Sequence, residues 1–271
     1  MADQADQVVV ITGAVGGIGG ALARSFAADG AKVVLADLHA DLVAEAADEL
    51  AGSGAEVLAV ATDVSDPDAV DRLAQATVER FGSVQVICNN AGTVLRGPAW
   101  DISLDDWHRV MGVNFWGVVH GIRSFVPLLL AQDGPGYVVN TASMAGVMSL
   151  PSLSPYVASK HAVVGVSEVL VHDLAAAGAA DRIGVSVVCP GYVPSRLGMA
   201  DPRAPIPEAP PGSVTLDDVA ASVRAAMAER RFYVFTHPGS TDVVTKRAAA
   251  TVDGRAPFGM RVPEPDRKEQ A

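Results

Sequence analysis

The sequence predicts a doubly wound α/β fold, in which helices cover both faces of a parallel sheet. Two observations predict it. Strand-prone and helix-prone stretches alternate from Val8 onward, and the strand-prone runs are continuously apolar, as expected of strands buried on both faces. The chain has 271 residues, 49% of them hydrophobic and 19% charged, which is enough for one large core. We therefore expect a single domain over residues 1–271, with its core in residues 8–236.

The composition argues against several classes of protein. A net charge of −11 and the lack of a basic cluster disfavour nucleic acid or an anionic membrane surface as a partner. The two cysteines, Cys88 and Cys189, lie in runs rich in Val and Ile, so we expect buried free thiols, no disulfide and no metal site. The polar N-terminus and the lack of an apolar run of ~20 residues predict a cytoplasmic protein.

The first expected strand, Val8–Thr12, runs directly into a glycine-rich turn and then into the helix-prone stretch Ala21–Ala28. Glycines at such a junction let the backbone turn tightly and approach a pyrophosphate, which is held at the helix N-terminus by unpaired N–H groups. The spacing does not fit G-x-G-x-x-G but fits G-x-x-x-G-x-G through Gly13, Gly17 and Gly19. The stretch therefore predicts a dinucleotide-binding turn.

Each of the next two expected strands ends at, or just before, an aspartate. Lys32–Asp37 ends in Asp37, near the ~20-residue offset at which an acidic residue hydrogen-bonds the adenosine ribose and repels a 2′-phosphate. This favours NAD over NADP. Val57–Thr62 is followed by Asp63, for which we expect the adenine edge as partner, with capping of the turn as the alternative. Helices are expected over residues 41–51 and 65–81.

A fourth strand, Val84–Cys88, precedes the sequence Asn89-Asn90-Ala91-Gly92. The polar residues singled out so far thus lie at the carboxyl ends of strands, where the ligand crevice of a doubly wound sheet lies. A long helix is then expected from Leu104 to about Leu130, and it carries Asn114 among apolar neighbours. A buried amide needs hydrogen-bond partners, which a ligand site or a neighbouring carbonyl would supply.

The segment from residue 137 to residue 160 brings a hydroxyl, a phenol and an ammonium group together. The strand Tyr137–Thr141 ends just before Ser143, and Ser154 with the proline after it predicts the capped start of a new helix. Tyr156 and Lys160 are neighbours on one face of that helix. A unit charge ~4 Å from the phenol, at an effective dielectric of ~20, is worth ~4 kcal/mol, or ~3 pKa units. That would bring the pKa of the phenol near neutrality, so we predict the active site here.

The rest of the chain completes the sheet and adds a flap. The region after the sixth strand contains five prolines between residues 201 and 212, which forbid a regular helix and predict an extended flap beside the active site. The C-terminal extension has no motif, and we expect it to pack on a neighbouring subunit or to fray. The expected segments are strand Val185–Cys189, the flap at about residues 194–213, helix Asp217–Arg230, strand Phe232–Thr236 and the extension 237–271.

Together these motifs resemble those of the classical short-chain dehydrogenase/reductase family. The resemblance covers residues 8–236 and implies a Rossmann sheet of about seven strands, NAD(H) or NADP(H) as cofactor, and a homo-oligomer, either a tetramer or a dimer. The matching motifs occur in the family's order and spacing: Thr12-Gly13-x-x-x-Gly17-Ile18-Gly19, Asp63, Asn89-Asn90-Ala91-Gly92, Asn114, Ser143, Tyr156-x-x-x-Lys160 and Pro190-Gly191.

The resemblance implies a role for each catalytic residue. Tyr156 is the general acid or base, and Ser143 hydrogen-bonds the reacting oxygen. Lys160 lowers the pKa of the phenol and binds the nicotinamide ribose, while Asn114 holds a water that links Lys160 to solvent. The cofactor-binding residues that it implies are Gly13, Gly17, Ile18, Gly19, Asp37, Asp63, Val64, Asn90, Ala91, Gly92, Tyr156, Lys160, Pro190, Gly191, Val193 and Ser195.

Two positions depart from the family's pattern. Gly20 stands where a larger, often basic residue is common. Ser195 stands where a threonine usually binds the carboxamide, and because serine keeps the hydroxyl we expect weakened rather than lost cofactor positioning.

The segments expected around the nicotinamide are mostly apolar, which favours a secondary alcohol or ketone that is apolar, aryl or alicyclic. Arg96 and Arg196 are the cations in these segments, so a hydroxy acid held by a guanidinium is the alternative substrate. A nucleotide-binding regulatory protein without turnover is a second alternative, disfavoured because every catalytic position is present. The predicted substrate residues are Val94, Leu95, Val147, Met148, Leu153 and Tyr192, with Leu150, Leu197 and Met199 as further pocket residues.

Overall fold

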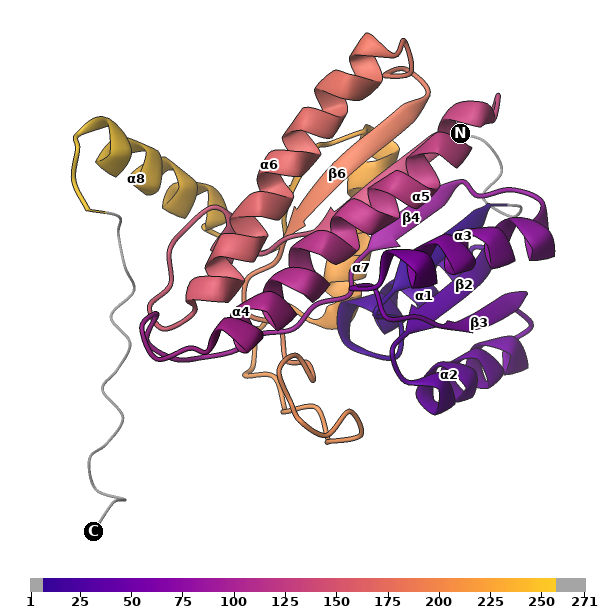
Figure 1. Cartoon of the computed structure of the whole chain (residues 1–271), viewed down its shortest axis with the longest axis horizontal. Coiled ribbons are helices and arrows are strands. Elements are labelled where there is room, and N and C mark those ends of the chain that lie inside the picture. Colours follow the sequence, from indigo (N-terminus) through magenta and orange to yellow (C-terminus); the bar gives the residue numbers. More distant parts are fainter. Residues whose placement is uncertain (1–6, 257–271) are drawn as a thin grey trace.

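The computed structural model describes residues 7–256, and it confirms the predicted doubly wound sheet (Figure 1). Seven parallel strands lie in the order β3-β2-β1-β4-β5-β6-β7. The order reverses between β1 and β4, which places the ligand crevice of such a sheet at the carboxyl ends of these two strands. The strands are β1 Val8–Thr12, β2 Lys32–Asp37, β3 Val57–Ala61, β4 Val86–Asn89, β5 Gly136–Thr141, β6 Ile183–Cys189 and β7 Tyr233–Phe235.

The helices form two layers because successive residues of each strand point to opposite faces of the sheet. On β1, Val9 and Ile11 belong to one hydrophobic cluster with Phe26, whereas Val8 and Val10 belong to another with Phe125. The first layer is made by α1 Gly17–Ala28, α2 Ala40–Gly52 and α7 Leu216–Glu229, and the second by α3 Pro67–Phe81, α5 Gly117–Ala131 and α6 Ser154–Ala176.

The long helix predicted from Leu104 is present, but it is not uniform. It consists of α4 Leu104–Met111, a π-helical turn η2 Gly112–Trp116, and α5. The π turn surrounds Asn114, and such turns occur preferentially at functional sites. The helix passes close to the end of β3, because a Cβ added to Gly117 would lie 2.8 Å from a methyl carbon of Val64.

By length and composition, the continuous helix Leu104–Ala131 could also cross a membrane, although 44% of its most apolar window is buried inside the molecule. The sequence reasoning did not identify this candidate. Here the helix covers the sheet, with Phe125 and Leu129 buried against the strands.

One expectation about a helix start is wrong. Ser154 is the first residue of α6 rather than its N-cap, and its buried hydroxyl has no hydrogen-bond partner among the described residues. The C-terminal extension forms a helix, α8 Ser240–Val252, that projects away from the body (Figure 1). The guanidinium of Arg247 on α8 lies 2.6 Å from Nε2 of His161 on α6. Residues 257–271 of the expected extension lie outside the described residues.

The segment between β6 and α7, where the flap is predicted, contains no helix or strand. Gly198 and Gly212 adopt positive φ angles of 81° and 78° within it. The capping box of Thr215 and Asp218 then starts α7. The flap is therefore an irregular loop anchored between two regular elements.

Candidate active site

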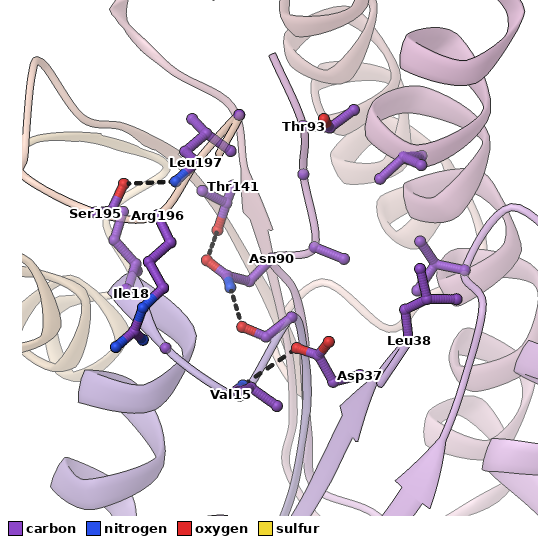
Figure 2. A pocket seen from close by; sticks show the side chains of 18 of the residues that line it. Val15, Ile18, Asp37, Leu38, Asn90, Thr93, Thr141, Ser195, Arg196 and Leu197 are labelled. Carbon is purple, nitrogen blue, oxygen red and sulfur yellow. Dashed lines mark hydrogen bonds between the residues drawn. The ribbon is translucent and has the colours of Figure 1, made fainter. Parts of the chain in front are cut away.

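A cavity of about 690 Å³ opens at the carboxyl ends of the central strands (Figure 2). Its walls come from the glycine turn, the ends of β2 to β5 and the segment after β6. Every predicted cofactor residue except Gly19 lines it. Of the predicted catalytic residues, Ser143, Tyr156 and Lys160 line it, whereas Asn114 does not. The structure thus brings together residues that lie more than a hundred positions apart in the sequence.

The glycine turn has the shape that a dinucleotide phosphate needs. Gly13 has a φ of +65°, and a Cβ added there would lie 2.8 Å from Cα of Ala91. A Cβ added to Gly19 would lie 2.1 Å from the carbonyl oxygen of Gly13, so Gly19 shapes the turn from behind the wall. Gly16 caps α1 without a side-chain hydrogen bond, which leaves the first N–H groups of the helix for an anion. These residues fit the pyrophosphate of a dinucleotide.

Asn90 ties the carboxyl ends of β1 and β5 together. Its side-chain amide donates to the carbonyl oxygen of Thr12 at 3.0 Å, and its Oδ1 accepts a hydrogen bond from Thr141 at 3.3 Å. The hydroxyl of Thr12 in turn accepts hydrogen bonds from the backbone N–H groups of Asn90 and Ala91. Asn90 therefore supports the floor of the cavity in addition to lining it.

The two predicted adenosine carboxylates behave differently. Asp37 lines the cavity, and its Oδ2 accepts a hydrogen bond of 3.2 Å from the backbone N–H of Val15 in the glycine turn (Figure 2). Asp63 also lines the cavity, but its Oδ1 accepts from the backbone N–H and the hydroxyl of Ser65 at 2.9 and 2.7 Å. The structure therefore shows the capping role of Asp63 that was the alternative interpretation.

Asn114 is fully buried, and its side-chain amide is held by hydrogen bonds. Its Oδ1 accepts from the backbone N–H of Thr93 at 2.7 Å, and its Nδ2 donates to the carbonyl oxygen of Thr93 at 2.9 Å and to the hydroxyl of Ser159 at 3.0 Å. The amide is thus held between the loop after β4 and α6. A Cβ added to Gly92 would lie 3.4 Å from Asn114 Oδ1 and 3.7 Å from Lys160 Nζ, so these groups surround one small space.

Tyr156 and Ser143 lie together in the wall of the cavity. Burial raises the pKa of the Tyr156 phenol, and its hydrogen bond with Ser143 opposes that shift. The hydroxyl of Ser143 accepts from the backbone N–H of Ala145 at 3.1 Å, which fixes its position at the end of β5. The structure therefore differs from the expected lowering of the phenol pKa, because desolvation outweighs the other contributions.

Lys160 is only 3% exposed, and its Nζ lies 5.8 Å from the ring centroid of Tyr156. Burial lowers the pKa of Lys160 to about 8. Its ammonium donates to the carbonyl oxygen of Thr141 at 2.8 Å. Lys160 is therefore tied to the last residue of β5, and part of its charge is directed at the carboxyl end of the sheet.

Sequence reasoning missed His237, which follows β7 and lies outside every motif. Its Nδ1 accepts a hydrogen bond of 3.1 Å from the backbone N–H of Gly191. The other ring nitrogen, Nε2, therefore carries the proton and donates to the carbonyl oxygen of Tyr192 at 2.9 Å. A Cβ on Gly191 would lie 2.9 Å from this ring, so the histidine holds the loop that carries Pro190 and Gly191.

None of the six predicted substrate residues lines the cavity, although some lie beside it. Val94 and Leu153 form a small hydrophobic cluster with Tyr156. Met148 is buried in another cluster against which Val147 packs, and Tyr192 is 69% exposed. Two of the further pocket residues, Leu197 and Met199, do line the cavity, and so does Thr93 at the start of the segment that contains Val94. The assignment of the substrate residues stays a prediction.

The two cysteines are free and buried, as predicted. Burial raises the pKa of each thiol to about 12, so neither is a reactive nucleophile. Within residues 7–256, no group of three or more His, Cys, Asp or Glu side chains could hold a metal ion.

Comparison with known proteins places this site in a family. The family model for short chain dehydrogenases matches residues 7–204. The chain belongs to the short-chain dehydrogenase family. One relative, the 1-deoxy-11-beta-hydroxypentalenate dehydrogenase of Streptomyces avermitilis, is 40% identical over 232 residues, which cover 84% of this chain and 83% of that protein. The C alpha-dehydrogenase of a Sphingobium species is 30% identical over 276 residues, covering 95% and 89%.

A solved structure of a family member supports the assignment. The crystal structure of a short-chain dehydrogenase/reductase from Burkholderia phymatum in complex with NAD superimposes with a TM-score of 0.90. It is 40% identical to this chain and covers 97% of it, and this chain covers 100% of that structure. The short-chain dehydrogenase described here therefore shares its whole architecture with a family member that binds NAD.

Proposed function

We propose that this short-chain dehydrogenase is an NAD-dependent oxidoreductase that interconverts a secondary alcohol and a ketone. The observation that carries the proposal is that Ser143, Tyr156 and Lys160 line the same cavity as the glycine turn and Asp37. A reacting carbon and a dinucleotide can therefore be held in one space. The NAD complex of the Burkholderia phymatum structure supports the choice of cofactor, and Asp37 supports NAD over NADP because its charge would repel a 2′-phosphate.

In the proposed mechanism, NAD, when bound, supplies the hydride acceptor for alcohol oxidation. The hydroxyl of Ser143 holds the substrate oxygen beside the phenol. The ionised form of Tyr156 accepts the hydroxyl proton as the carbon loses its hydride, so that the alcohol becomes a ketone. The charge of Lys160 would stabilise the phenolate, and its ammonium would hold the nicotinamide ribose when NAD is bound. Asn114 would hold the water through which the proton leaves. In the reverse direction, Tyr156 returns the proton.

The substrate that we propose is apolar, aryl or alicyclic. The cluster of Val94, Leu153 and Tyr156 and the cavity-lining side chains of Leu197 and Met199 support this choice, because each buried methylene contributes about 0.8 kcal/mol to binding. A cytoplasmic location and a homo-oligomer, tetramer or dimer, stay predictions.

One observation favours a hydroxy acid as a second candidate. The Streptomyces avermitilis relative is named for a hydroxypentalenate, whose name denotes a carboxylate that carries a hydroxyl group. Arg96 is exposed on the loop after β4, two residues after Val94, and its guanidinium could bind a carboxylate of such a substrate.

The proposal is tested by a panel of secondary alcohols and ketones with NAD or NADH, followed by the absorbance of NADH. We expect turnover of bulky aryl or alicyclic secondary alcohols with a higher kcat/KM than hydroxy acids of similar size. A hydroxy acid with the higher kcat/KM, which loses that advantage in Arg96→Ala, would assign the second candidate instead. Cofactor binding without turnover of any member of the panel, in either direction, would indicate a nucleotide-binding regulatory protein.

A further inference from the structure

The flap carries an arginine that points away from the substrate end of the cavity. Arg196 follows Ser195, and its side chain extends along the wall toward the glycine turn (Figure 2). A Cβ added to Gly16 would lie 3.0 Å from Nη1 of Arg196. The Nε of Arg196 donates to the carbonyl oxygen of Ala204 at 2.7 Å, which fixes the side chain within the flap. The guanidinium therefore lies directly against the turn before α1.

The charge of Arg196 is not balanced by a carboxylate. Within residues 7–256 it forms no ion pair, whereas Arg109, which also lines the cavity, is paired with Asp106 at 2.7 Å. Gly16 is the cap residue of α1, where free N–H groups already favour an anion. A half-buried cation and a helix N-terminus thus point at the same part of the cavity.

We propose that Arg196 binds the pyrophosphate of NAD, so that the flap closes on the cofactor rather than only on the substrate. This inference rests on the proposed use of NAD. A guanidinium matches a phosphate group because its N–H donors can bond two oxygens at once. The position of Arg196 against Gly16 also argues against the role considered from the sequence, in which it would hold a carboxylate of the substrate.

A second arginine fastens the flap on the other side of the cavity. Arg203 donates from Nη1 and Nη2 to the carboxylate of Glu45 at 3.0 and 2.8 Å, and from Nη2 to Asp41 at 3.0 Å. Asp41 and Glu45 are one turn apart on α2, which begins shortly after Asp37. Arg203 precedes Ala204, whose carbonyl holds Arg196. Arg203 is thus a positioning residue that ties α2 to the pyrophosphate clamp.

The test is a set of equilibrium binding measurements on the full chain without substrate. Calorimetry with NAD and ADP-ribose, and competition by adenosine, compare ligands with and without the pyrophosphate. We expect Arg196→Gln to weaken NAD and ADP-ribose binding about tenfold or more and to leave adenosine binding within about twofold. Arg203→Gln should weaken the same two ligands about two- to threefold, because its ion pairs are exposed to solvent.

Arg24→Gln is the matched control, because it removes the same charge from α1, where Arg24 is exposed and paired with Asp217. It should change NAD binding less than about twofold. The inference is overturned if Arg196→Gln binds NAD and ADP-ribose as the wild type does, or if adenosine binding falls equally. If the wild type binds no NAD, the proposed cofactor itself is wrong. If it binds NAD through Arg196 but oxidises no alcohol, only the proposed reaction fails.

Discussion

The ammonium of Lys160 donates a hydrogen bond of 2.8 Å to the carbonyl oxygen of Thr141, the last residue of β5. This bond joins the second turn of α6 to the carboxyl end of the sheet. It keeps a charged group in a position that is only 3% exposed, where desolvation alone would favour the neutral amine. The lysine is therefore a structural tie between α6 and β5, in addition to the catalytic role proposed for it.

Tyr156→Phe should abolish turnover and leave NAD binding nearly unchanged. The substitution removes the group that transfers the proton but leaves the glycine turn intact. Steady-state rates and an NADH fluorescence titration on the same preparation measure the two effects. Retention of more than a few per cent of the wild-type rate would assign the acid or base to another residue.

Lys160→Ala should lose turnover and NAD binding together, because it also breaks the bond to Thr141.

Asp37→Ala should narrow the preference for NAD over NADP. The carboxylate would accept hydrogen bonds from the ribose hydroxyls of NAD and would repel a 2′-phosphate, and its removal also frees the N–H of Val15. The values of kcat/KM for the two cofactors, measured with one alcohol, give the preference directly. Equal values in the wild type would contradict the assignment.

Gly19→Ala should weaken NAD binding, whereas Gly20→Ala should raise the stability of the fold, although the two residues are adjacent. At Gly19 the new methyl group would lie 2.1 Å from the carbonyl oxygen of Gly13, so the turn must distort and NAD binding should fall at least about tenfold. At Gly20 the closest atom would be 3.4 Å away. Alanine there should raise stability by about 0.5–1 kcal/mol, because glycine is unfavourable inside a helix. Calorimetric binding and urea unfolding of both variants check this pair.

Cys88→Ala should make the stability less sensitive to alkaline pH. Burial raises the pKa of the Cys88 thiol from 9.0 to about 12, so the unfolded chain loses this proton first. The stabilising contribution of the neutral thiol is complete below pH 9 and is lost as pH rises toward 12. At about pH 10.5 the free energy of unfolding has fallen by about 2 kcal/mol from this cause. Urea unfolding at neutral pH and at about pH 10.5 should show a smaller drop in the variant. An equal drop would mean that other groups, such as Cys189, carry the effect.

The sequence predicted the sheet well because its strands are short apolar runs that end in glycine or polar residues. The limits of β1 and β2 agree with those predicted, and Gly13, Asp37 and Asn90 meet as expected. These signals are local in the sequence, and the parallel order of the strands makes them converge at one edge.

The features that the sequence did not predict depend on contacts between distant segments. His237 is positioned by hydrogen bonds to a loop that lies more than forty residues earlier in the chain. The side chain of Arg196 is oriented by its hydrogen bond to the carbonyl oxygen of Ala204, and no sequence pattern distinguishes it from a solvated arginine. The pKa of Tyr156 depends on how deeply the phenol is buried, which helical spacing does not reveal.

The π turn at Gly112–Trp116 fixes the number of residues in the helix that contains it. Such a turn holds one residue more than an α-helical turn, and each residue of an α-helix rotates the chain by ~100°. Loss of one residue here would restore a regular helix but would swing Phe125 and Leu129 away from the sheet. Relatives with this helix should therefore carry their insertions and deletions in the loops that flank it, and the length of Leu104–Ala131 should be as strongly constrained as the identity of Asn114.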